Sequence, residues 1–229
     1  MNIAETIQSV VSPPHKAGYP FIIGGVVALI VGLLLWHPLA WLGLIFALFC
    51  LYFFRDPERV PPPRETAFVA PADGLVVSIE RAVPPAELGL APEPRMRVAI
   101  FLSVLDVHVN RAPIAGTVQK IAYHPGLFLS AAEDKASDDN ERNALLLRTN
   151  DGQDVVVVQI AGLIARRILC NVTEGQTLAT GQRFGIIRFG SRTDLYLPEG
   201  CAPLVTVGQR MIGGETVIAE LSPRAAIFP

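Results

Sequence analysis

The chain has 229 residues, of which 51% are hydrophobic and 17% are charged, and its formal net charge is −2. This balance lacks the basic surface that nucleic-acid binding requires, so we exclude that class of protein. Its three cysteines form no Cys-x-x-C or Cys/His cluster, which argues against a zinc site and against a disulfide framework.

The first predicted element is an apolar run at residues 21–54 that contains no charged residue. A Trp-His-Pro sequence divides it into two stretches of about 16 residues, each roughly 24 Å long as helix, against a hydrocarbon core of about 30 Å. Pro38 disfavours helix at the residue before it, which favours a helical hairpin with His37-Pro38 at the turn over one long, kinked span. The pattern leaves open whether the hairpin crosses the bilayer or enters one leaflet.

Basic residues flank this run and none lies at its turn: they are Lys16, Arg55, Arg59 and Arg64. Basic flanks predict that both ends lie on the cytoplasmic side of the cell membrane. The run starts too late and is too long for a cleaved signal peptide. We therefore predict a juxtamembrane segment at 1–20, a membrane-embedded hairpin at 21–54 and a proline-rich linker at 55–65.

After residue 65 the pattern becomes that of β-strands. Runs rich in Val and Ile alternate with Gly, Pro, Asn and Asp, as in GLVVSIE, RMRVAIFL, NALLLRT and DVVVVQIAG. Asn150-Asp151-Gly152 lies between two such runs and predicts a hairpin turn. No long amphipathic helix follows the linker. We expect residues 66–229 to form one mainly β domain, an antiparallel, sandwich-like structure.

Gly190-Ser191 lies in the strand-like stretch RFGSRTDLYLP, and as an isolated pair it is typical of a turn. A serine can also attack the carbonyl before it, if that peptide is strained or polarised and a base removes the hydroxyl proton. Glycine suits the attacked position because it adds no side chain and accepts unusual backbone angles. An N-to-O shift, β-elimination and hydrolysis would then leave a pyruvoyl group, an electrophile that reacts with amines much as PLP does.

This chemistry needs a base and a group that orients it. Two of the four histidines lie before or within the apolar run, which leaves His108 in FLSVLDVHVNRAP and His124 in YHPG. His108 lies at a polar strand end, whereas His124 is typical of a turn. Asp73, in the Pro-x-Asp-Gly turn of APADG, is the preferred acid, and the competing acids are Asp106 and Asp194.

Taken together, these segments resemble a known family. HKAGYPFI, FRDPER, APADG, FLSVLDVHVNRAP, YHPGLF, NERN and RFGSRTDLYLP occur in the order seen in phosphatidylserine decarboxylases. The sequence is most similar to the short bacterial form, which archaetidylserine decarboxylases also resemble. Members of this family are self-processing, pyruvoyl-dependent membrane lyases.

The resemblance implies cleavage between Gly190 and Ser191 into a larger chain, 1–190, and a smaller chain, 191–229. Ser191 would become the pyruvoyl group, with neither a metal nor PLP as cofactor. The partners would be a membrane phospholipid and the other chain of the same precursor. The resemblance leaves open whether this heterodimer assembles further.

Site residues also carry over. Asp73 matches the acid of the family's processing triad, and His108 matches the first histidine of the long-form DYHRVH pattern. The second histidine falls on Arg111, and the long-form LGST is FGSR here. It therefore stays open whether His108 serves both processing and decarboxylation or Arg111 takes a share.

The implied activity is that of a carboxy-lyase, which converts phosphatidylserine to phosphatidylethanolamine and CO2 in phospholipid biosynthesis. The candidates for contact with the substrate's phosphate or carboxylate are Arg111, Arg188 and Arg192, with His124 as a further candidate for substrate binding. The lipid backbone, diacylglycerol or archaeal ether, stays open.

A binding module is the alternative. APADGLVV and VGQRMIGGETVIAEL also resemble hairpins of biotinyl- and lipoyl-carrier domains or of membrane-anchored adaptors. A carrier presents a lysine at its turn, where this chain has Met211-Ile212-Gly213-Gly214. An adaptor needs coiled-coil heptads, and the sequence has none.

Overall fold

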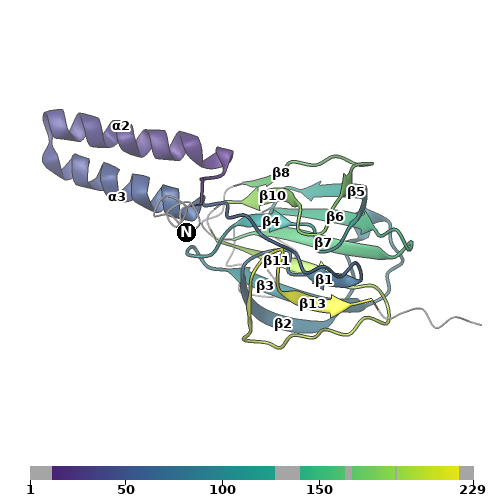
Figure 1. Cartoon of the computed structure of the whole chain (residues 1–229). Coiled ribbons are helices and arrows are strands. Elements are labelled where there is room, and N and C mark those ends of the chain that lie inside the picture. The colour runs from purple at the N-terminus through teal and green to yellow at the C-terminus, as the bar shows by residue number, and fades with distance from the viewer. Residues whose placement is uncertain (1–11, 127–139, 163–166, 189, 222–229) are drawn as a thin grey trace, which may run out of the picture. The chain divides into compact units, whose positions relative to one another are not determined.

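The computed structural model of the chain describes residues 12–126, 140–162, 167–188 and 190–221 (Figure 1). It divides into two compact units, the first comprising 1–58 with 105–109 and the second comprising 59–104 with 110–229. Most of the predicted juxtamembrane segment, 1–20, lies outside the described residues.

The first unit is built around two apolar helices. A short 3-10 turn, η1 (Lys16–Gly18), leads into α2 (Tyr19–Leu35), and α3 (His37–Phe53) follows. Trp36 is extended, with φ −163° and ψ 103°, and it alone separates the two helices. The break is therefore one residue earlier than the predicted His37-Pro38 turn, because proline is well accommodated in the first turn of a helix.

Helices α2 and α3 lie side by side and antiparallel, and their contact is made by small residues (Figure 1). A Cβ built on Gly32 would lie 2.1 Å from the backbone nitrogen of Ala40, and one on Gly43 would lie 2.4 Å from that of Leu29. Close backbone approach through glycine is typical of helix pairs in membranes.

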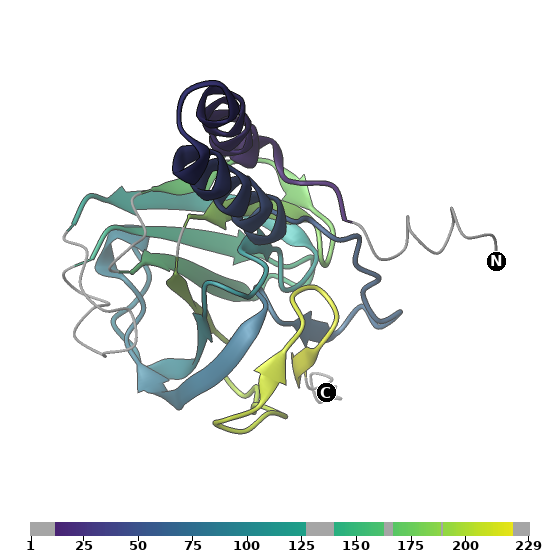
Figure 2. The same cartoon turned by 90° about the vertical axis from the view of Figure 1, so that its left-hand side faces the viewer.

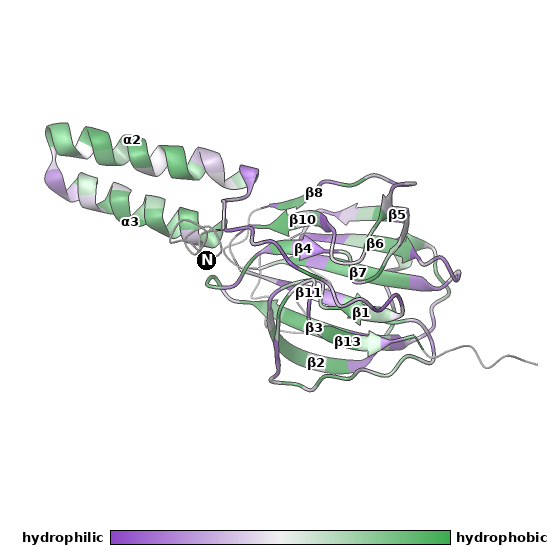
Figure 3. Ribbon diagram, viewed as in Figure 1, coloured by the Kyte–Doolittle hydropathy of each residue, from purple (hydrophilic) through white to green (hydrophobic). Residues whose placement is uncertain are grey.

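The outer faces of both helices are apolar and exposed (Figure 3). By length and composition, the helical segment Lys16–Leu35 is long and apolar enough to cross a membrane, with 20 residues and a mean hydropathy of 2.3. His37–Phe53 is equally continuous but shorter.

The second unit contains an eight-stranded antiparallel sheet in the order β12-β2-β3-β11-β7-β6-β5-β9. Figure 2 shows how strongly this sheet curls. Its strands are β2 (Gly74–Ala82), β3 (Arg95–Leu102), β5 (Gly116–His124), β6 (Arg142–Arg148), β7 (Asp154–Ala161), β9 (Thr177–Leu178), β11 (Ser191–Tyr196) and β12 (Arg210–Met211). The prediction of a mainly β, antiparallel domain is confirmed.

Two smaller sheets and one helical turn complete the second unit. One sheet pairs β1 (Ala67–Val69) with β13 (Val217–Glu220), and the other has the order β4-β10-β8. The bounds of these last elements are β4 (Val109–Arg111), β8 (Ile168–Cys170), β10 (Arg183–Ile187) and the 3-10 turn η2 (Ala86–Leu88). The predicted turn at Asn150-Asp151-Gly152 is confirmed: it joins β6 to β7, and Gly152 has φ +77°.

Strand β11 lies in the middle of the large sheet, between β3 and β7. Its six residues are all buried, and because side chains alternate along a strand they divide between two faces. Leu195 packs into the main hydrophobic core, and Ser191 and Thr193 share its face. Tyr196 packs against a second cluster that includes Leu88 of η2, so Arg192 and Asp194 share that opposite face.

Candidate active site

The Gly190-Ser191 pair lies where the chain enters the central strand. Ser191 is the first residue of β11 and pairs with Leu102 on one side and Ala161 on the other. Gly190 has φ +76°, in the left-handed region that other residues rarely adopt. A Cβ there would meet nothing closer than 4.0 Å, so it is the backbone conformation, and not crowding, that favours glycine.

The two groups that would react at this pair have unusual surroundings. Ser191 is fully buried, and its Oγ has no hydrogen-bond partner in the described part of the chain. The carbonyl oxygen of Gly190 accepts a hydrogen bond from the backbone N–H of Gly162, at 3.1 Å. Buried hydroxyls are nearly always bonded, so this one, which has no partner among the described residues, calls for an explanation.

Asp73 lies near the same end of the sheet as Ser191. It directly precedes β2, and the register places Leu75 and Arg192 opposite the same residue of β3, Phe101. The backbones of Asp73 and Ser191 are thus about two strand spacings, or roughly 10 Å, apart.

The Asp73 carboxylate is bonded to groups within the second unit. One oxygen accepts the backbone N–H of Gly213 at 2.7 Å, and the other pairs with Arg59 at 2.9 Å. These contacts fix the position of the carboxylate at the start of β2.

His108 belongs to the first unit. Its ring packs on that of Phe53, with centroids 4.3 Å apart, and its Nδ1 lies 2.9 Å from the carbonyl oxygen of Asp106. A carbonyl only accepts, so this bond places the proton on Nδ1 and leaves Nε2 as the proton acceptor.

The charge of His108 follows from its burial. Loss of hydration lowers its pKa from 6.5 to about 4, the backbone and charge of Asp106 oppose this shift, and Arg55 adds to it. The imidazole is therefore neutral at pH 7, as a general base must be. Since Asp73 and Ser191 belong to the second unit, the triad of the three residues stays a prediction.

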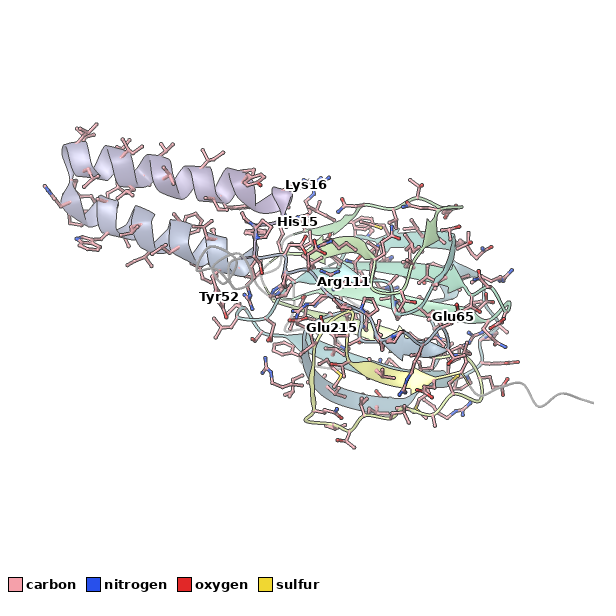
Figure 4. All side chains as sticks on the ribbon, in the orientation of Figure 1. His15, Lys16, Tyr52, Glu65, Arg111 and Glu215 are labelled. Atoms are coloured by element: carbon pink, nitrogen blue, oxygen red, sulfur yellow. The ribbon has the colours of Figure 1, made fainter. Side chains whose placement is uncertain are left out.

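The predicted substrate-binding residues have different environments. Arg111 is buried in the second unit and donates from Nη1 to the carbonyl oxygen of Gly181 at 3.0 Å (Figure 4). A Cβ on Gly214 would lie 2.9 Å from the Arg111 Cδ, so glycine there leaves room for the arginine. His124, at the end of β5, is exposed, and its Nδ1 lies 4.0 Å from Glu87.

Arg192 forms a buried, two-point ion pair with Asp194. The contacts are Nε to Oδ1 at 2.6 Å and Nη2 to Oδ2 at 3.0 Å, and each side chain is 1% exposed. Arg97 of β3 lies 3.6 Å from the same carboxylate. This pair is on the face of the sheet opposite Ser191.

The sequence analysis missed a row of buried amides on the Ser191 face. Gln159 donates to Asn110 at 2.7 Å, Asn143 donates to Gln159 at 2.9 Å, and Asn110 donates to the Thr193 hydroxyl at 3.3 Å. The available signal was a glutamine inside the apolar run VVVVQIAG. The Gly162 N–H was also missed, because a backbone donor leaves no trace in the sequence.

Among the residues that the structure describes, no group of three or more His, Cys, Asp or Glu side chains is arranged to hold a metal ion. The residues around position 191 do fit a group made from the chain itself. They combine a left-handed glycine and a polarised carbonyl with a buried hydroxyl that has no partner in the part of the chain that the structure describes.

Comparison with known proteins defines the class. The family model described as phosphatidylserine decarboxylase matches residues 46–219. The chain is 66% identical to the phosphatidylserine decarboxylase proenzyme of Granulibacter bethesdensis, over 97% of this chain and 91% of that protein. It is 57% identical to the proenzyme of the same name from Cereibacter sphaeroides, over 97% and 96% of the two chains. For the proenzyme of Gluconacetobacter diazotrophicus the identity is 59%, over 96% and 100%.

This protein is therefore an enzyme, a carboxy-lyase. The chain belongs to the phosphatidylserine decarboxylase family. This finding favours the lyase prediction over the carrier or adaptor alternative.

Proposed function

We propose that this protein decarboxylates phosphatidylserine to phosphatidylethanolamine and CO2 at the cell membrane, after cutting its own chain between Gly190 and Ser191. The observation that carries the proposal is the buried Ser191 hydroxyl, which has no hydrogen-bond partner among the described residues and follows a left-handed glycine with a polarised carbonyl. The word proenzyme in the relatives' names supports a precursor that is processed.

In the processing step, Ser191 Oγ attacks the carbonyl carbon of Gly190. His108 takes the hydroxyl proton, for which its neutral state and the unprotonated Nε2 are suited. The negative charge of Asp73 stabilises the imidazolium that forms when His108 takes up this proton. The products are chains 1–190 and 191–229, which stay together as a heterodimer.

A pyruvoyl group at position 191 supplies a carbonyl that reacts with the substrate's amine and accepts the electrons released with CO2. Residues of the chain bind the substrate and deliver the proton to it. His108 delivers the proton to the substrate's Cα. Arg111 is our preferred partner for the phosphate or carboxylate, because Arg192 would first have to leave Asp194. His124 stays a candidate for substrate contact.

The apolar helices account for access to a lipid. Segment 21–54 would hold the enzyme in the bilayer, with the domain at 66–229 on the cytoplasmic side and 55–65 as the linker. The acyl chains of the substrate could then stay in the membrane while the headgroup enters the site.

The test is the covalent state of the purified protein. Denaturing gel electrophoresis should show two chains for the wild type and one for Ser191→Ala. Mass spectrometry of the smaller chain should find a pyruvoyl group at its amino end instead of serine. Ser78→Ala, which removes an exposed strand hydroxyl, serves as the matched control and should be cut normally. An uncut wild-type protein with full activity on phosphatidylserine vesicles would overturn the proposal.

A further inference from the structure

We propose that the peptide unit joining Ala161 to Gly162 is the oxyanion donor for self-cleavage, and that Asn140 is the residue that positions it. The inference rests on the proposed function, since it concerns the cut at Gly190-Ser191. Its starting point is the hydrogen bond from the Gly162 N–H to the Gly190 carbonyl oxygen, at 3.1 Å.

The donor matters because negative charge develops on the Gly190 oxygen during the attack by Ser191. The Ser191 Oγ forms a bond to the Gly190 carbonyl carbon and gives its proton to the base. The electron pair of the C=O bond moves to the Gly190 oxygen, which becomes an anion. The C–N bond then breaks, the nitrogen takes up a proton, and an ester with a free amine results. Hydrogen bonds to an ionised acceptor are about twice as strong as neutral ones, so the N–H stabilises the intermediate more than the starting peptide.

The donor is held in place before the reaction. Ala161, the last residue of β7, is directly paired with Ser191 of β11, so Gly162, which follows the strand, faces Gly190. The other side of the peptide unit is fixed by Asn140, whose Nδ2 donates to the Ala161 carbonyl oxygen at 2.8 Å.

One planar peptide thus receives a hydrogen bond at its oxygen and gives one at its nitrogen. The first bond polarises the unit and strengthens the second, because hydrogen bonds in a chain are cooperative. Asn140 and Ala161 are both fully buried, where electrostatic interactions are less screened than in water. A fully buried asparagine that donates to the reacting region in this way acts as a positioning residue.

The experiment follows the appearance of the smaller chain from freshly synthesised full-length precursor. Gly162→Pro removes the N–H and should slow cleavage by about 10²-fold, the cost of losing one oxyanion donor. Gly162→Ala keeps the N–H and should be cut within a few-fold of the wild-type rate. Cleavage of Gly162→Pro at the wild-type rate would overturn the inference.

A second pair of variants tests the positioning role of Asn140. Asn140→Asp replaces the donating amide with a carboxylate and should slow cleavage about 10-fold, a fraction of the loss of the donor itself. Asn143→Asp removes another buried amide donor, which contacts Gln159 instead, and should be cut nearly normally. If the two variants slow cleavage equally, the role of Asn140 is refuted.

Two further measurements separate catalysis from folding. Hydroxylamine cleaves esters, so it should not accelerate cleavage of Gly162→Pro, in which ester formation is the slow step. Acceleration by hydroxylamine would contradict the inference.

Thermal unfolding in the uncut Ser191→Ala background shows whether Gly162→Pro folds. If it does not fold, translation with glycolic acid at position 162 replaces the N–H by an ester oxygen at almost the same size. Cleavage of that chain at the wild-type rate would overturn the inference, whereas an uncut wild-type chain would overturn the proposed function instead.

Discussion

Replacing Asp194 with asparagine should destabilise the protein far more than an ordinary ion-pair deletion. Both Asp194 and Arg192 are 1% exposed, and the carboxylate meets the guanidinium through two short contacts. Asp194→Asn leaves the Arg192 charge buried without its counter-ion. Breaking a buried pair by removing one partner costs about 3–5 kcal/mol. That is a large part of the total stability of a domain, which is about 5–15 kcal/mol.

The assay is urea unfolding in the Ser191→Ala background, in which the proposal predicts a single chain. The matched control is Asp154→Asn, since Asp154 makes a similar two-point contact with Arg148 at 2.9 and 3.2 Å. The Arg148 side chain is 48% exposed, so solvent screens this pair and its loss should cost far less than the loss of the buried pair.

A third variant removes both charges. Arg192→Met with Asp194→Leu should recover most of the stability, because no uncompensated charge remains buried. If Asp194→Asn costs no more than Asp154→Asn, or if the double variant is as unstable as the single one, the burial argument is wrong.

Two more perturbations test the first unit. Because burial lowers the pKa of His108 from 6.5 to about 4, the unfolded chain takes up the proton first as pH falls. The free energy of unfolding should therefore decrease by about 3 kcal/mol between pH 6.5 and 4. His108→Gln in the uncut background should remove this pH dependence. If the dependence persists in the variant, it does not arise from His108. Gly43→Leu should lower the thermal stability of the helices in detergent by about 1–3 kcal/mol, because a Cβ there would lie 2.4 Å from the Leu29 backbone. Gly24→Leu, with nothing within 4 Å of its Cβ, is the control, and equal effects of the two would refute the close packing.

Much of the fold could be predicted because its signals are local. Pro38 indicates a break in the apolar run, and the turn residues at 150–152 indicate a hairpin, since each acts through its own backbone preference. The break was misplaced by one residue because proline also starts helices well. Strand register, by contrast, depends on distant segments, so the pairing of Ser191 with Ala161 could not be predicted.

The candidate site likewise combines features that the sequence indicates with features that depend on distant segments. The Gly190-Ser191 pair carries a side-chain signal, but the donor that polarises its carbonyl is a backbone group at Gly162. The row of buried amides joins residues 49 and 83 positions apart in the chain. Charged residues are rarely buried, so nothing in the sequence predicts that Arg192 is enclosed with Asp194 instead of meeting solvent.

The position of Ser191 at the start of a central strand has a consequence for the severed molecule. The smaller piece would contribute β11 between β3 and β7, β12 beside β2, and β13 beside β1. Each of its three strands is thus paired with strands of the larger piece. Separating the pieces would require breaking all of these strand pairings together and opening the curled sheet. A nicked molecule should therefore neither lose its small fragment on dilution nor exchange it with neighbouring copies, and it would behave as one permanent body in spite of its broken backbone.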